Sequence, residues 1–135
     1  MSTIRYPAKF EILDEVRDHV GQLARQHGFG ERAVYSVQLA ADEAASNIIE
    51  HAYAGRQNET FLLRCDYAND RLIMTFLDDG DSFDFSRVKA PDLTADLSKR
   101  KIGGLGIFLM HKLMDEVDYK VTQSGNFLTL VKRKE

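Results

Sequence analysis

The apolar positions of this chain change their spacing several times, and each change marks a predicted element. Residues 3–8 form a short β-like run that carries a proline near its end. From residue 10 to the glycines at 28 and 30, and again from residue 31 to residue 53, apolar side chains recur every three or four positions. This spacing predicts one strand followed by two helices, the second of them ending near Gly55.

The second half of the chain alternates differently. Residues 59–67 and 71–78 are two β-rich runs joined by residues 68–70, which predicts a hairpin. Residues 86–103 lose apolar periodicity and predict one long loop, of the kind that is usually functional or mobile in a compact domain. A helix is predicted over 103–116, and a second hairpin follows, with its turn at Ser124, Gly125 and Asn126.

This order of elements predicts the fold class. Strand, two helices, two strands, loop, helix and two strands are expected to form an α/β (α+β) two-layer sandwich, with helices on one face of a mainly antiparallel mixed sheet. The chain has 135 residues with 44% hydrophobic and 29% charged side chains, which are ordinary values for a globular protein. We therefore expect a single domain over residues 1–135.

Charge and cysteine content exclude some functions. The net charge of -3, from 18 basic and 21 acidic residues, argues against broad binding to nucleic acid, which needs Lys and Arg to neutralise phosphates. The N-terminal sequence lacks a leader pattern, and no apolar run approaches the length that crosses a bilayer, so a cytoplasmic protein without membrane contact is expected. The single cysteine, Cys65, alternates with apolar neighbours and is expected in the core.

The first stretch with candidate chemistry is ADEAASNIIEHAY, residues 41–53. Glu43 and Asn47 lie 40° apart on a helical wheel and share a face with Glu50, opposite the apolar side. Periodicity alone is compatible with two interpretations: a solvated helix face, which it favours, or a row of functional groups. His51 is expected to close the helix end rather than to act as a base.

The second stretch is LDDGDSFDF, residues 77–85. It is either an acidic turn or a place where a carboxylate and a glycine receive a flat group. A carboxylate such as Asp78 would suit adenine, whose exocyclic amine donates a hydrogen bond, whereas guanine presents an acceptor there. The spacing does not fit an EF-hand, because Gly80 comes too soon.

The third stretch is KRKIGGLGIFLM, residues 99–110. Glycines at 103, 104 and 106 open a helix, where free backbone N–H groups and the helix dipole favour phosphate. The alternative is a flexible turn after a solvated basic run. The Walker A sequence, the Rossmann fingerprint and the protein-kinase signatures do not occur, and no histidine has ligand spacing for zinc.

Together and in this order, DEAASNIIEHAY, DDGDSFD and GGLGIFLMHKLMDEV resemble the N, G1 and G2 boxes of the GHKL ATPases, which have the Bergerat ATP-binding fold. The resemblance covers almost the whole chain and is greatest to the small bacterial anti-sigma-factor serine/threonine kinases. Two positions depart from the pattern of the wider superfamily. Ser82 stands where many relatives have a second glycine, and Asn126 with Phe127 replaces a common threonine.

The resemblance implies a role for each matching residue. Glu43 is the implied general base, Asn47 a magnesium ligand, Asp78 the adenine acceptor, and residues 86–103 an ATP lid. The further implied ATP contacts are Gly80, Phe83, Arg100, Gly103, Gly104, Leu105 and Gly106. Magnesium needs only one or two protein oxygens besides the phosphates, so a single Asn is sufficient.

The implied function is an ATP- and Mg²⁺-dependent protein serine kinase that also sequesters a sigma factor. Its substrate would be a serine of an anti-anti-sigma protein, and the resemblance also implies a homodimer. Two alternatives stay open at this point. One is a nucleotide-gated module that binds partners with little or no kinase activity, and the other is a self-contained ATPase.

Overall fold

The computed structural model describes residues 1–82 and 104–134. Their order along the chain is as predicted, strand first and two strands last. The elements are β1 (Ser2–Pro7), the short 3-10 helix η1 (Phe10–Ile12), α1 (Leu13–Gln26), α2 (Glu31–Asn47), the π-helical turn η2 (Ile48–Ala52), β2 (Thr60–Ala68), β3 (Arg71–Asp78), α3 (Gly104–Leu113), β4 (Glu116–Thr122) and β5 (Gly125–Arg133).

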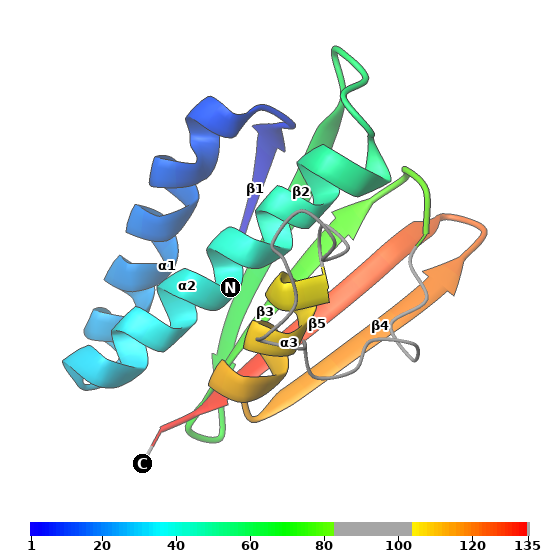
Figure 1. The fold of residues 1–135 in the computed structure, drawn as a ribbon. Coiled ribbons are helices and arrows are strands. Elements are labelled where there is room, and N and C mark those ends of the chain that lie inside the picture. The colour runs from blue at the N-terminus through cyan, green and yellow to red at the C-terminus, as the bar shows by residue number, and fades with distance from the viewer. Residues whose placement is uncertain (83–103, 135) are drawn as a thin grey trace, which may run out of the picture.

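The strands form one five-stranded sheet in the order β1-β2-β3-β5-β4, and every pairing among the described residues is antiparallel. Helices α1, α2 and α3 lie on the same face of this sheet, as Figure 1 shows. The predicted two-layer sandwich is therefore confirmed. Strand β3 is central, so its last residue, Asp78, comes out in the middle of one end of the sheet.

Helices α1 and α2 pack against each other as well as against the sheet. The buried face of α1 carries Val16, Val20 and Ala24, and α2 presents alanines, whose small side chains allow close packing. Arg17 of α1 forms an ion pair with Asp42 of α2. Asp42 therefore points toward α1.

The two hairpins differ from expectation in only one turn. Asn69 and Asp70 have φ angles of 54° and 59°, the left-handed pair that a two-residue hairpin turn requires, and the predicted turn at 68–70 is confirmed. The second turn was predicted at Ser124, Gly125 and Asn126, but the structure places it one residue earlier, at Gln123 and Ser124. Strand β5 begins at Gly125, so Asn126 belongs to the strand and pairs with Asp78.

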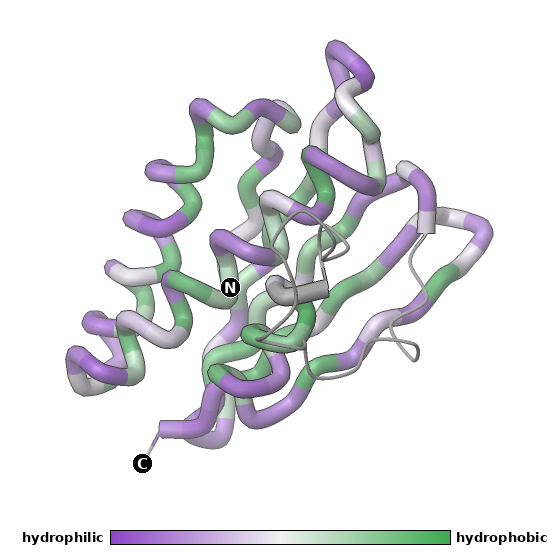
Figure 2. The backbone as a smooth tube through the Cα atoms, viewed as in Figure 1, coloured by the Kyte–Doolittle hydropathy of each residue, from purple (hydrophilic) through white to green (hydrophobic). Residues whose placement is uncertain are grey.

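The core lies between the sheet and the helices. Figure 2 shows apolar residues along the central strands and polar residues at their turns. Cys65 is buried in this core as predicted, and burial raises the pKa of its thiol to about 12. No helix in the described part of the chain combines the length and the apolar character that a bilayer crossing needs.

Candidate nucleotide site

Glu43 and Asn47, both on α2, do not lie on an open helix face. Asn47 is only 8% exposed, and its Nδ2 atom has no hydrogen-bond partner among the described residues. Gly106, in the first turn of α3, faces Glu43 so closely that a Cβ atom there would lie 2.5 Å from Glu43 Oε2. The solvated interpretation is therefore wrong for Asn47, and the Glu43 carboxylate lies against the start of α3.

This placement changes the acid–base character of Glu43. Burial raises the pKa of its carboxyl, and the negative charges of Asp42 and Glu50 raise it further. A carboxylate whose pKa is nearer to neutrality takes up a proton more readily. The charge and burial of Glu43 are thus suited to a general base.

The end of the same helical segment anchors the Gly80 turn. A π-helical turn, η2, continues α2, and such turns are frequent at functional sites. The carbonyl oxygen of Ala52, its last residue, accepts hydrogen bonds from the Asp81 N–H at 2.7 Å and from Arg56 Nη2 at 2.9 Å. A Cβ atom on Gly80 would lie 2.2 Å from that oxygen. Only glycine allows this approach, which fixes the turn beside the helix that carries Glu43.

Asp78 is held by two donors. Its Oδ1 atom accepts hydrogen bonds from the Gly80 N–H at 3.0 Å and from Asn126 Nδ2 at 2.8 Å. Among the described residues, no hydrogen bond reaches its Oδ2 atom, which can therefore accept one from a ligand. Burial raises the pKa of this carboxyl and Asp79 adds to the rise, while Asn126 and the Gly80 N–H oppose it.

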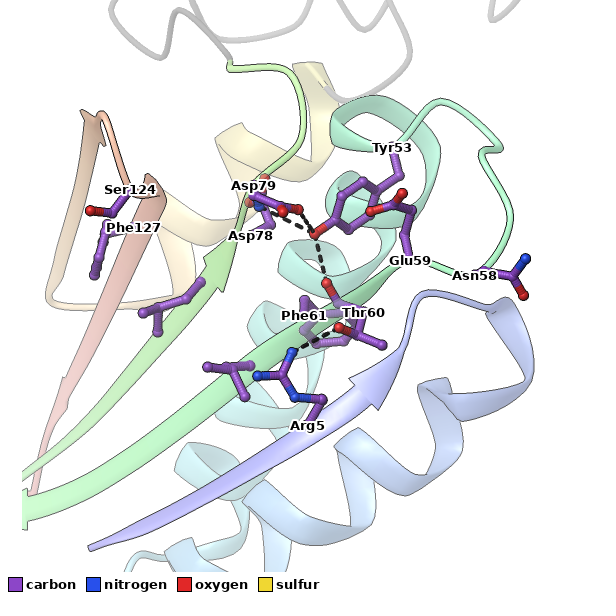
Figure 3. A pocket seen from close by; sticks show the side chains of 12 residues that line it. Arg5, Tyr53, Asn58, Glu59, Thr60, Phe61, Asp78, Asp79, Ser124 and Phe127 are labelled. Atoms are coloured by element: carbon purple, nitrogen blue, oxygen red, sulfur yellow. Dashed lines mark hydrogen bonds between the residues drawn. The ribbon is translucent and has the colours of Figure 1, made fainter.

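Asp79, the neighbouring carboxylate, serves a structural purpose. The Tyr53 hydroxyl lies 2.7 Å from Asp79 Oδ1 and 2.6 Å from the Thr60 carbonyl oxygen, and it donates its one proton to either; the Asp79 N–H donates to the hydroxyl oxygen (Figure 3). Tyr53 is buried, and burial raises its pKa, so it stays a donor at neutral pH. The two adjacent aspartates thus differ in role. Asp79 connects the end of β3 to Tyr53, the residue that follows η2, whereas Asp78 keeps an oxygen available for a ligand.

The hollow drawn in Figure 3 is separate from the predicted phosphate end of the site. Its lining residues include Arg5, Leu62, Leu77 and Phe127. These four are cross-strand neighbours in register, and they alternate with the residues that face the helices. The hollow therefore opens on the helix-free face of the sheet. It shares Asp78 with the predicted site but not Glu43, Asn47 or Gly106.

Several predicted site residues lie outside the described residues or are only partly described. Phe83, Arg100 and Gly103 are outside them, and so is the lid predicted over 86–103. Gly104 and Leu105 are placed in the first turn of α3. The structure thus brings together Glu43 and Gly106 at one end, and Asp78 with Gly80 at the other. Asn47 is buried on the same helix as Glu43, and the Gly80 turn contacts Ala52 at the end of that helical segment.

Sequence reasoning missed two residues that shape this site. Asn126 was assigned to a turn, yet it holds Asp78. Its signal was available, since Asn126 alternates in phase with the apolar residues Leu128 and Leu130, and a polar side chain at such a position must find a partner. Arg56 was not singled out. It follows the helix end, where basic side chains commonly bind the last carbonyls.

Comparisons with known proteins agree on one family for this chain. Residues 6–132 match the model of the histidine kinase-like ATPase domain. The protein named serine-protein kinase RsbW of Listeria monocytogenes is 32% identical over 119 residues, which are 85% of this chain and 76% of that protein. The protein of the same name from Bacillus subtilis is 32% identical over 120 residues, 84% of this chain and 74% of that protein.

Solved structures agree on the fold. The RsbU and RsbW domains of a Mycobacterium tuberculosis protein align with a TM-score of 0.69 at 16% identity, covering 99% of this chain and 33% of that one. The catalytic domain of the histidine kinase ThkA aligns with a TM-score of 0.59 at 12% identity, covering 99% of this chain and 97% of that one. This chain therefore belongs to the family of histidine kinase-like ATPase domains, and it is similar to relatives named serine-protein kinase RsbW over most of its length.

Proposed function

We propose that this protein is an ATP-dependent protein serine kinase that also acts as an anti-sigma factor. The observation that carries the proposal is the packing of α3 on Glu43. It places a partly buried carboxylate of raised pKa beside the first turn of a helix, where phosphate is favoured. A module that only binds a nucleotide would not need a base at that place.

The adenine end of the site rests on Asp78. Its Oδ2 atom accepts a hydrogen bond from the exocyclic amine of adenine, and Gly80 leaves space for the flat ring. Guanine carries an acceptor at the corresponding position and would face the carboxylate with no proton to share. This complementarity supports ATP as the substrate.

At the phosphate end, Glu43 accepts the proton of an incoming serine hydroxyl. The serine oxygen then forms a bond to the γ-phosphorus while the bond from that phosphorus to ADP breaks. Backbone N–H groups at the start of α3, from Gly104, Leu105 and Gly106, offer hydrogen bonds to the phosphates. Positioning and charge stabilisation supply most of the catalysis in such a transfer.

The resemblance assigns Asn47 to a magnesium site. Its side chain is buried, and its Nδ2 atom has no hydrogen-bond partner among the described residues, but that atom is a donor and does not bind a cation. Its carbonyl oxygen would hold the ion, and water and phosphate oxygens complete the coordination of such ions. The ion, when bound, neutralises charge on the phosphates.

The partners follow from the resemblance to the anti-sigma kinases and from the relatives named serine-protein kinase RsbW. We propose a sigma factor as the sequestered partner and a serine of an anti-anti-sigma protein as the phosphate acceptor. The chain would act in the cytoplasm, without direct contact to nucleic acid or membrane, and a homodimer is the proposed assembly.

The test is phosphoryl transfer from γ-labelled ATP to a candidate anti-anti-sigma protein. Glu43→Gln is expected to lower transfer at least about a hundredfold while ATP affinity stays within about threefold of the unaltered chain. Glu31→Gln is the matched control, since Glu31 lies exposed at the start of the same helix, paired with Arg25. Unchanged transfer in Glu43→Gln would remove Glu43 from the mechanism.

The same assay separates the two alternatives. ATP binding without any transfer by the unaltered chain would support a nucleotide-gated binding module. Steady hydrolysis without a partner would support a self-contained ATPase. Partner-dependent transfer that requires Glu43 supports the kinase.

A further inference from the structure

Asn126 is one of two polar or charged residues that are buried among the described residues, and it is 2% exposed. Asn126 and Asp78 are direct cross-strand partners of β5 and β3. The Asn126 amide donates one hydrogen bond to Asp78 Oδ1 at 2.8 Å and another to the Gly80 carbonyl oxygen at 3.0 Å. Both donors of a buried side chain are thus used on the adenine end of the site.

The backbone before Asn126 is shaped for this contact. Gly125 has a φ of +139°, and a Cβ atom there would lie 2.4 Å from the Asp78 carbonyl oxygen. A larger residue would push β5 away from the end of β3. Glycine at this position therefore lets the amide of Asn126 span the turn from Asp78 to Gly80.

The amide also acts on the charge of Asp78. An N–H donor stabilises a carboxylate more than the neutral acid, so Asn126 opposes the rise in the pKa of Asp78 that burial causes. The charge of Asp79 raises the pKa of Asp78, and the neutral Tyr53 hydroxyl lies within hydrogen-bond distance of Asp79. Arg5 and Glu59 line the hollow next to Asp78 on the other face of the sheet.

Protonation of Asp78 would change what the site recognises. The ionised carboxylate is an acceptor only, which matches the amine of adenine. The neutral acid carries a proton that it can donate to the oxygen of guanine. Preference for adenine therefore depends on keeping Asp78 ionised and its Oδ2 atom available.

We propose that Asn126 is a positioning residue that sets the base preference of this site. It occupies Asp78 Oδ1 and the Gly80 carbonyl oxygen with its two donors, and thereby leaves Asp78 Oδ2 as the acceptor for adenine. A threonine at this position would have a single hydroxyl donor and could not make both bonds. The inference rests on the proposed adenine role of Asp78.

The experiment compares nucleotide binding by Asn126→Leu, Asn126→Thr and the unaltered chain from pH 5.5 to pH 8. The probes are a non-hydrolysable ATP analogue and the corresponding GTP analogue. Their affinity ratio cancels the titration of the phosphates, which both analogues share. Thr129→Val is the matched control, because Thr129 lies on the same strand, faces the other side of the sheet and also loses a donor.

In Asn126→Leu, the ratio of ATP-analogue affinity to GTP-analogue affinity is expected to be about tenfold lower at pH 6 than at pH 8. The unaltered chain and Thr129→Val should change by less than about threefold, and Asn126→Thr should fall between them. If Asn126→Leu fails to fold, the ¹³C titration of the Asp78 carboxyl in Asn126→Thr must still move to higher pH than in the unaltered chain.

The inference is overturned if a folded Asn126→Leu protein shows an affinity ratio that does not change with pH. It is also overturned if Asp78 titrates at the same pH in Asn126→Thr and in the unaltered chain. Asp78→Asn separates this failure from failure of the proposed function. If Asp78→Asn destroys the preference for the ATP analogue and the Asn126 variants do not alter it, only the role of Asn126 is wrong. If Asp78→Asn leaves the preference intact, the adenine assignment itself is wrong.

Discussion

Replacing Gly80 with alanine places a Cβ atom where no room exists for it. The atom would lie 2.2 Å from the Ala52 carbonyl oxygen, 2.5 Å from the carbonyl carbon and 3.0 Å from the Ala52 Cβ. The two closest atoms belong to the backbone of η2, which cannot turn aside as a flexible side chain could. The turn must therefore move away from the helix end by about an ångström to reach ordinary contact distance.

That movement breaks contacts that matter to the site. The Asp81 N–H donates to the same Ala52 oxygen at 2.7 Å, and the Gly80 N–H donates to Asp78 at 3.0 Å. Overpacking of this kind costs about 1–3 kcal/mol of stability. We place Gly80→Ala near the upper end of this range, because the two closest atoms that the new Cβ meets belong to the backbone of Ala52. For a domain of this size, a loss of about 3 kcal/mol lowers Tm by roughly 10 °C.

Thermal unfolding and ATP binding together test this reasoning. Gly80→Ala should lower Tm by that amount and weaken binding of an ATP analogue by about tenfold or more, because Asp78 loses its position. Gly30→Ala is the control, since a Cβ there meets nothing within 4 Å and φ is -71°. A Gly80→Ala protein with unaltered Tm and ATP affinity would refute the close approach to η2 as the reason for glycine.

Three further predictions concern Asp78, Glu43 and Cys65. Asp78→Asn should weaken binding of the ATP analogue by about tenfold and reduce discrimination against GTP, because its amide lacks the charge that strengthens the bond to adenine. Titration calorimetry measures both effects, and unchanged discrimination would contradict the adenine role of Asp78. Glu43 must be ionised to accept a proton and burial raises its pKa, so the single-turnover transfer rate should fall as pH drops through a value above the ordinary range of glutamate. A transfer rate that stays constant down to the ordinary glutamate range would speak against a raised pKa. Cys65 has a pKa of about 12 in the fold, so iodoacetamide at pH 8 should modify the native protein slowly and the unfolded chain quickly, and equal rates would place the thiol outside the core.

Much of the fold followed from the sequence because strands and helices have different apolar periods. The alternation in residues 59–67 and 71–78 predicted β2 and β3, and the turn between them was found at Asn69 and Asp70. The second hairpin was misjudged because Gly125 signals a turn by its composition. In the structure its positive φ instead serves the close approach of β5 to Asp78.

The site was less accessible to sequence reasoning, since a helical wheel gives the direction of a side chain but not what covers it. Asn47 shares a face with exposed Glu50, yet it is buried, and α3 packs on Glu43 of the same face. The contact between Glu43 and Gly106 is long-range, and no local pattern near Glu43 encodes it. Asp78 was identified from its own stretch of sequence, but the contact with Asn126 that holds it was not, because Asn126 lies on another strand.

We propose that Glu43, Asn47 and Asp78 belong to one ATP pocket on the helical face of the sheet. Backbone amide NMR of the protein with a non-hydrolysable ATP analogue and Mg²⁺ can locate the bound nucleotide residue by residue. We predict the largest shift changes at Glu43, Asn47, Asp78, Gly80 and Gly106, with little change at Arg5, Leu62 and Phe127. If the shift changes gather at those three residues instead, the nucleotide binds in the hollow on the open face, and Glu43 and Asn47 are not part of its site.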